Sequence, residues 1–226
     1  MSHLFSNISS LVTNDDEEWE IINAAFVVDD GKIAWVGRAS EAPSCDLFTD
    51  LDEKAVVPGF VDSHSHLVFA GDRASEFEAR MTGQTYSAGG IRTTVAATRA
   101  ASDDVLRQNV ARLADEMLQS GITTFETKSG YGLTVHDEIR SLKIAREFTE
   151  EVTVLAAHVI PNEFADNPDG YVSMVIDEIL PAAGGIARWV DVFCDVGAFS
   201  AEQTRRIFTA AKLLGFQLRI HANQLT

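Results

Sequence analysis

Two histidines at the end of an apolar run carry the strongest chemical signal in the sequence. His64 and His66 follow an apolar run made of Val56, Val57, Phe60 and Val61. A run of this composition is typical of a strand that is covered on both faces in a parallel sheet. Side chains at positions i and i+2 of a strand point the same way, so the two imidazoles can share one metal ion. A lone histidine beside a strand is more often a structural residue, but the pair favours metal binding.

His221 is the natural third ligand, because it ends a later strand as His64 and His66 end the first. Three protein ligands and a water make the usual open catalytic metal site. Water bound to such a metal loses its proton near neutral pH and becomes a nucleophile, and the metal also polarises a carbonyl. Hydrolysis of an amide-like bond is therefore the predicted reaction class. Imidazole suits zinc, iron, copper or nickel, so these residues do not choose the metal.

Three other polar side chains follow expected strand ends. Arg73 offers a planar fork for a carboxylate, although a surface salt bridge is an equal alternative. Tyr131 lies in the loop KSGYGL, where glycines let a ligand approach the backbone. His158 precedes Pro161 and could donate to a substrate carbonyl. A structural loop role is the alternative for Tyr131 and His158.

Lys128 raises the question of a second metal. A carboxylated lysine at a strand end can bridge two metals, but the fourth expected strand ends in VFCDVG without a lysine. A single metal ion is the prediction.

The elements that would position these residues alternate between strands and helices after residue 50. Beyond the first strand, we expect strands at 123–128, 152–158, 189–194 and 217–221, and helices at 102–119, 137–149, 171–183 and 200–214. Ser102, and Ser200 with Gln203, provide helix N-caps. Before them, residues 21–38 read as a hairpin turning at Asp29-Asp30-Gly31.

Repeated strand–helix units predict an α/β fold with a parallel sheet. The polar residues at the carboxyl ends of successive strands favour a (β/α)8 TIM barrel, and PGFVDSHSH is not the glycine-rich turn of a doubly wound fold. We expect a small β-sandwich-like domain at 1–55 and the barrel domain at 56–226. About five strands are expected where a barrel needs eight, which predicts a fragment of a longer protein, truncated after the fifth strand.

Net charge and cysteine content limit which kinds of binding partner and which cellular compartment we expect. The net charge of −16 opposes binding to nucleic acid or to an anionic membrane. Cys45 and Cys194 are isolated, and no secretory signal or membrane span is evident, which predicts a soluble cytoplasmic protein. The expected partner is a small-molecule substrate, and a homodimer is left open.

Several motifs in order resemble the imidazolonepropionase family of the amidohydrolase superfamily. They include PGFVDSHSHLVFAGDR, ETKSGYGL, AAHVIPNEFA, DVFCDVGAFS and IHANQL. The resemblance implies hydrolysis of 4-imidazolone-5-propanoate to N-formimino-L-glutamate in histidine degradation, with one zinc or iron ion. It implies metal ligation by His64, His66 and His221, and a substrate carboxylate held by Arg73. By the same resemblance Tyr131 and His158 contact the imidazolone, Gln224 lies near the substrate, and His158 and Gln224 act in catalysis.

The chain also departs from that family's pattern. Family members carry a further histidine and a metal-binding aspartate on later strands, and some have a glutamate at the position of Gln224. The stretch 86–90 is shorter than in similar enzymes. Two alternatives therefore stay open: another amidohydrolase, such as a ring aminohydrolase or deaminase, and an inactive metal-binding fragment.

Overall fold

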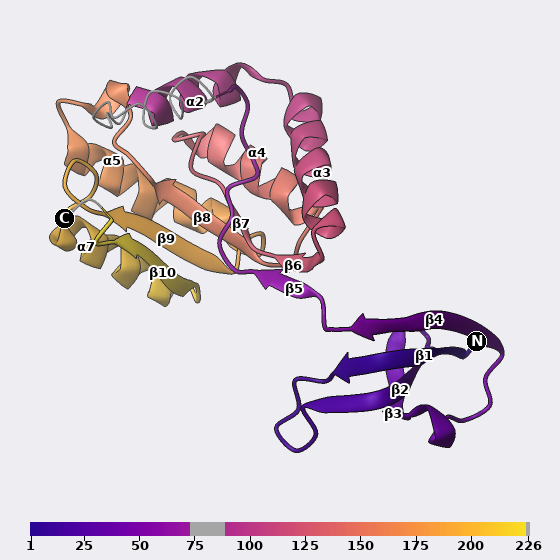
Figure 1. Ribbon diagram of the computed structural model, residues 1–226. Coiled ribbons are helices and arrows are strands. Elements are labelled where there is room, and N and C mark those ends of the chain that lie inside the picture. Colours follow the sequence, from indigo (N-terminus) through magenta and orange to yellow (C-terminus); the bar gives the residue numbers. More distant parts are fainter. Residues whose placement is uncertain (73–88, 225–226) are drawn as a thin grey trace, which may run out of the picture. The chain divides into compact units, whose positions relative to one another are not determined.

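The computed structural model describes residues 1–72 and 89–224 of the chain (Figure 1). Arg73 and most of the short stretch at 86–90 lie outside these residues. The chain forms two compact units, Met1–Phe60 and Val61–Thr226. The units divide later than the expected boundary after residue 55, because strand β4 runs on to Val56 and pairs there with β1.

The first unit is a four-stranded sheet in the order β3-β2-β1-β4. Its strands are β1 (His3–Val12), β2 (Glu20–Asp29), β3 (Lys32–Arg38) and β4 (Leu47–Val56), and a 3-10 turn spans Ala39–Glu41. β2 and β3 form the predicted hairpin, with Asp30 and Gly31 at φ 49° and 71°. Positive φ at both central positions gives the turn a twist that matches the strands.

The second unit alternates strands and helices around a parallel sheet in the order β10-β9-β8-β7 (Figure 1). Strands β5 and β6 pair with each other in a separate two-stranded sheet. The strands are β5 (Phe60–Asp62), β6 (Ile122–Phe125), β7 (Thr127–Lys128), β8 (Val152–Ala157), β9 (Trp189–Cys194) and β10 (Gln217–Ala222). The helices are α2 (Gly89–Ala100), α3 (Asp103–Gln119), α4 (Val135–Arg146), α5 (Pro168–Met174), α6 (Leu180–Ala183) and α7 (Ala201–Leu213).

Local capping sets the helix starts as the sequence predicted. The Ser102 side chain accepts from the Val105 amide at the start of α3, and Ser200 and Gln203 form a complete capping box before α7. The predicted helix at 171–183 is composite, because a π-helical segment, Val175–Ile179, joins α5 to α6. β8 is buried at every position and lies at the centre of the core.

Two strand predictions were wrong in detail. The run from Val56 to Val61 is not one strand covered on both faces: Val57, Phe60 and Val61 are 54%, 59% and 68% exposed among the described residues. Pro58 lacks an amide hydrogen, so the chain leaves β4 before β5 begins.

The strand expected at 123–128 is likewise divided. Glu126 separates β6 from β7, and its amide donates to the Asp62 carbonyl at 2.8 Å. Thr127 and Lys128 instead pair with β8. The chain thus changes pairing partner at Glu126, which places this residue between β5 and β8.

Strands β7, β8, β9 and β10 of the second unit pair in parallel and alternate with helices, as the sequence predicted. Polar residues lie at or just beyond their carboxyl ends, including Lys128 at the end of β7 and His158 after β8. Closure into an eight-stranded barrel stays a prediction. Across the described ranges, no helix has both the length and the apolar character that crossing a bilayer requires.

Candidate metal centre

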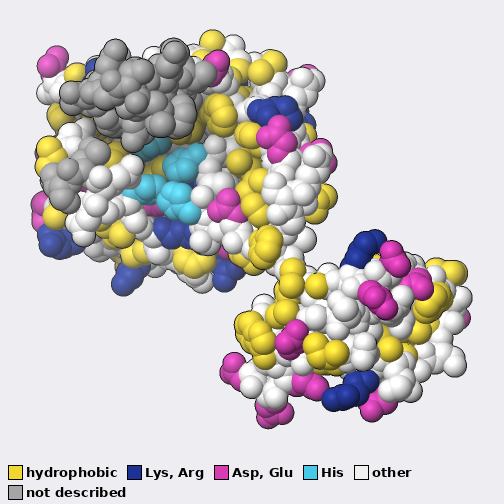
Figure 2. Space-filling view, in the orientation of Figure 1, with side chains coloured by type: hydrophobic (Ala, Val, Ile, Leu, Met, Phe, Trp, Pro, Cys, Tyr) yellow, Lys and Arg dark blue, Asp and Glu magenta, His cyan; other side chains and the backbone are white. Residues whose placement is uncertain are grey.

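Three histidines from two distant parts of the chain converge. His64 and His66 lie in the segment after β5, and His221 lies in β10. One nitrogen from each ring lies within 4.8 Å of the others. Nε2 of His64 is 2.9 Å from Nε2 of His221 and 3.4 Å from Nε2 of His66. Figure 2 shows histidine side chains gathered on one face of the second unit.

His64 and His66 lie close together, as predicted, but not because they alternate along a strand. β5 ends at Asp62, so both histidines lie just beyond the strand rather than in it. Their rings nevertheless face a common point, because the Asp62 carboxylate accepts from the His64 amide at 2.9 Å and turns the chain there.

The donor set fits a metal ion. Nδ1 of His221 lies 3.0 Å from Oδ1 of Asp191. An ionised carboxylate only accepts, so Nδ1 carries the hydrogen and Nε2 presents its lone pair toward His64. Nδ1 of His66 is buried without a hydrogen-bond partner among the residues that the structure describes. Imidazole nitrogens that face one another in this way need a shared proton or a cation between them.

The surroundings keep the rings of His64 and His66 neutral. Burial lowers the pKa of His66 to about 2, and the nearby charges of His158 and Lys128 lower it in the same direction. Burial, followed by the charge of Lys128, also lowers the pKa of His64. Only a neutral imidazole can ligate a metal, so this environment favours ligation at neutral pH.

Asp191 orients the third histidine, His221. It is buried in β9 and accepts from His221. Burial alone would raise the pKa of Asp191, but the hydrogen bond from His221 and the charge of Lys128 outweigh burial and lower that pKa. Asp191 therefore stays an anion, and a carboxylate behind a ligating histidine fixes the ring's tautomer and orientation.

Tyr131 and His158 lie beside the three histidines, as the sequence predicted. The ring centroids of His158 and His66 are 5.7 Å apart, and those of His158 and Tyr131 are 5.2 Å apart. Nδ1 of His158 lies 2.9 Å from the Gly130 carbonyl oxygen and therefore carries a hydrogen. In the neutral ring Nε2 is then an acceptor. Donation from His158 to a substrate carbonyl, which we expected, requires the doubly protonated ring.

Glu138 holds the loop that carries Tyr131, and sequence reasoning missed it. Its buried carboxylate accepts from the amides of Gly130, Gly132 and Leu133 at 2.8–3.2 Å. In the sequence it resembles an ordinary acidic residue in the first turn of α4. Only its burial in the folded chain distinguishes it, so no sequence signal could have identified it.

Two predicted site residues remain less defined. Gln224 lies in the bend after β10, where its backbone N–H donates to the Asp195 carboxylate at 2.9 Å. Its role near a substrate stays a prediction. Arg73 lies outside the described residues, and so its carboxylate-binding role also stays a prediction.

Comparison with known proteins supports the resemblance seen in the motifs. No family model matches the chain. The imidazolonepropionase of Streptomyces griseus subsp. griseus is 57% identical over 227 residues, which cover 98% of this chain and 58% of that protein. The imidazolonepropionase of Mycolicibacterium smegmatis is 56% identical over 227 residues, which cover 98% of this chain and 57% of that protein. The chain thus spans less than two thirds of the curated relatives it matches.

Solved structures support the fold. An amidohydrolase structure matches 98% of this chain and 56% of its own length with a TM-score of 0.63 at 17% identity. Atrazine chlorohydrolase from Arthrobacter aurescens, complexed with zinc, matches 99% of this chain and 53% of its own length with a TM-score of 0.53 at 21% identity. At these identities the likeness concerns the fold alone. The sequence similarity is much higher, because the two curated imidazolonepropionases are 56–57% identical to this chain over 98% of its length.

Proposed function

We propose that the chain supplies the metal centre of an imidazolonepropionase. The reaction is hydrolysis of the cyclic amide 4-imidazolone-5-propanoate to N-formimino-L-glutamate in histidine degradation. One observation carries the proposal: three imidazoles converge on one point beside Tyr131 and His158, in a chain that is 57% identical to a curated imidazolonepropionase. For the fold, we propose an amidohydrolase-type (β/α)8 barrel with a small β domain.

The proposed cofactor is one zinc or iron ion held by His64, His66 and His221. Such an ion supplies Lewis-acid activation of water and of an amide carbonyl. The protein's contribution is a preformed, largely neutral set of ligands, since burial lowers the pKa of both His64 and His66. The ligands therefore need not lose protons before they bind a metal at neutral pH.

His158 and Tyr131 are the proposed contacts to the imidazolone ring. Hydrolysis adds hydroxide to the carbonyl carbon and a proton to the departing nitrogen, so a group must carry that proton. Nε2 of His158 can take it, because the Gly130 carbonyl holds the hydrogen on Nδ1. We further propose that Arg73 binds the propionate carboxylate and that Gln224 lies near the reacting group.

Two other functions compete with this proposal. A ring aminohydrolase or deaminase would use the same metal chemistry on a purine-like ring. An inactive metal-binding fragment would keep the histidines without turnover. The carboxylate-binding fork of Arg73 favours an acidic substrate over a purine. Small-molecule binding, a cytoplasmic location and a homodimer belong to the same proposal.

The test compares two histidine variants of the zinc-loaded chain. His64→Ala removes a proposed ligand, whereas His136→Ala removes a histidine on α4 whose side chain is 82% exposed. We expect about one zinc per chain and ultraviolet-monitored loss of imidazolonepropionate for the unmodified chain and for His136→Ala, and neither for His64→Ala. Zinc binding without turnover would support the inactive fragment, and ammonia release from a purine would support the deaminase.

A further inference from the structure

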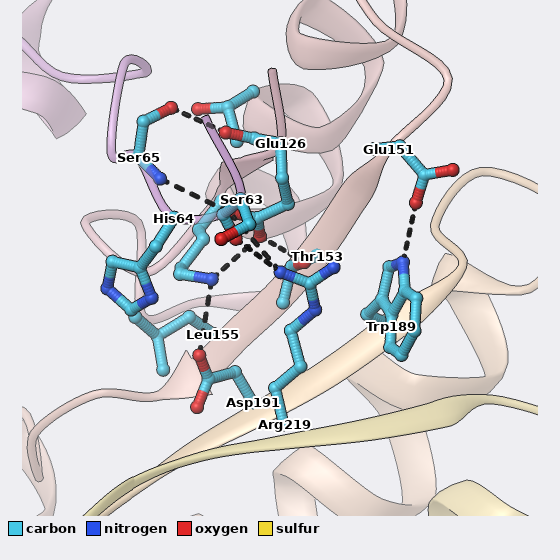
Figure 3. A network of polar contacts seen from close by, with 12 residues as sticks. Ser63, His64, Ser65, Glu126, Glu151, Thr153, Leu155, Trp189, Asp191 and Arg219 are labelled. Carbon is cyan, nitrogen blue, oxygen red and sulfur yellow. Dashed lines mark hydrogen bonds and ion pairs between the residues drawn. The ribbon is translucent and has the colours of Figure 1, made fainter. Parts of the chain in front are cut away.

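A buried ionic network adjoins the histidines, and Figure 3 shows its carboxylates, Glu126 and Asp191, near His64. Nζ of Lys128 is 2.7 Å from Oε1 of Glu126 and 3.3 Å from Oδ2 of Asp191. The three side chains are 0%, 2% and 1% exposed, respectively. Ions removed from water to this degree persist only when they are paired and hydrogen-bonded. The geometry thus makes Lys128 a cation shared by two carboxylates.

Glu126 connects this network to the first two histidines. Its carboxylate accepts from the Ser65 amide at 3.2 Å, and its backbone carbonyl accepts from the Ser65 hydroxyl. Ser65 is the residue between His64 and His66, so these bonds fix the backbone that carries both rings. The Thr153 hydroxyl also donates to the Glu126 carboxylate and limits its rotation.

Asp191 connects the network to the third histidine. Its carboxylate accepts from Nδ1 of His221, which directs the Nε2 lone pair toward the other two rings. Its second oxygen, Oδ2, lies 3.0 Å from the same nitrogen of His221 and 3.3 Å from Nζ of Lys128. Glu126 lies between β6 and β7, and Asp191 lies on β9, so Lys128 joins two carboxylates across the intervening strand β8.

We propose that Lys128 is a positioning residue that holds the two halves of the metal centre in register. Through Glu126 it fixes the segment of His64 and His66, and through Asp191 it fixes the orientation and tautomer of His221. The inference rests on the proposed metal site. A carboxylated lysine at this position would place a third negative charge against Glu126 and Asp191, so the free ammonium is the form that suits its surroundings.

The principal test is Lys128→Met in the full chain, which keeps the length of the side chain and removes its charge. Zinc affinity is measured by competition with a chromophoric chelator. We expect affinity to fall about 10–100-fold, the usual cost of losing a group that orients a ligand. Arg107→Met is the control, because Arg107 is also a paired cation but binds Asp104 on α3 and Glu147 at the C-cap of α4, neither of which contacts the three histidines. The zinc affinity of Arg107→Met should stay within about twofold of that of the unmodified chain.

A second variant keeps the proposal testable if Lys128→Met does not fold. In Asp191→Asn the carbonyl oxygen turns to Lys128, because an ammonium only donates, and the amide nitrogen then faces His221. The amide nitrogen then takes the place of Oδ1, 3.0 Å from Nδ1 of His221, which favours the hydrogen of His221 on Nε2, the proposed ligand atom. Nitrogen-15 NMR of the metal-free chain reads this tautomer directly, and we expect an Nδ1–H ring in the unmodified chain and an Nε2–H ring in Asp191→Asn.

The outcomes separate the two proposals. Unchanged zinc affinity in a folded Lys128→Met, or an unchanged His221 tautomer in Asp191→Asn, overturns the positioning role. An unmodified chain that binds no zinc overturns the proposed metal site. In that case the NMR measurement on the metal-free chain still decides whether the network sets the tautomer of His221.

Discussion

Replacement of Glu138 by alanine should release the loop that carries Tyr131. The Glu138 carboxylate is the acceptor for the amides of Gly130, Gly132 and Leu133. A buried amide left without an acceptor costs about 1–3 kcal/mol. Three such amides at the low end of that range amount to about 3 kcal/mol.

The low end is appropriate because Glu138 itself is costly to bury. Burial raises the pKa of Glu138, while the hydrogen bonds from Ser129 and from the loop amides act in the opposite direction. Removing the side chain relieves that desolvation and offsets part of the loss. Glu138→Gln keeps one carbonyl acceptor, so we expect it to lose less than half as much as Glu138→Ala.

Amide hydrogen exchange measures this effect where it arises. A loss of about 3 kcal/mol corresponds to exchange more than 100-fold faster at Gly130, Gly132 and Leu133. Glu147→Ala is the control, because Glu147 caps the end of the same helix and pairs with Arg107 on the surface. If the three loop amides keep their protection in Glu138→Ala, or lose it equally in Glu147→Ala, the carboxylate does not hold the loop.

Three further predictions concern pH, backbone and capping. The unfolded chain protonates His66 below its ordinary pKa of 6.5, whereas the folded metal-free chain holds that pKa near 2, so acidification below 6.5 should destabilise the fold. His66 should make the free energy of unfolding fall by about 1.4 kcal/mol per pH unit in this range. Urea unfolding of His66→Gln should lack this contribution, and equal pH dependence of the two proteins would contradict the role of His66. Gly130→Ala should cost about 1–3 kcal/mol, because φ is +109° and the new Cβ would lie 2.8 Å from the Leu155 carbonyl oxygen, and an unchanged urea midpoint would contradict this. Ser200→Ala should cost about 1 kcal/mol through loss of the α7 cap, and a thermal midpoint equal to that of the unmodified chain would refute the capping role.

The prediction of local structure succeeded where interactions join residues close in the chain. The capping box of Ser200 and Gln203 spans three residues, and the turn at Asp30-Gly31 needs only two residues that accept positive φ. Such signals are complete within a short window of sequence. The apolar run before His64 was misread for the opposite reason, since whether it is covered depends on neighbours that the run itself does not specify.

The sequence alone predicted the residues and the chemistry of the candidate site. His64, His66 and His221 at strand ends predicted the metal ligands and the reaction class, because side-chain chemistry and strand order are properties of the chain itself. Only the tertiary structure decided what surrounds them. Ser65 meets Glu126 across 61 positions and His221 meets Asp191 across 30 positions, and no periodicity records contacts at such separations. Burial makes Glu126 and Asp191, which look ordinary in the sequence, the partners of the segment that carries His64 and His66 and of His221, because a charge removed from water must be paired.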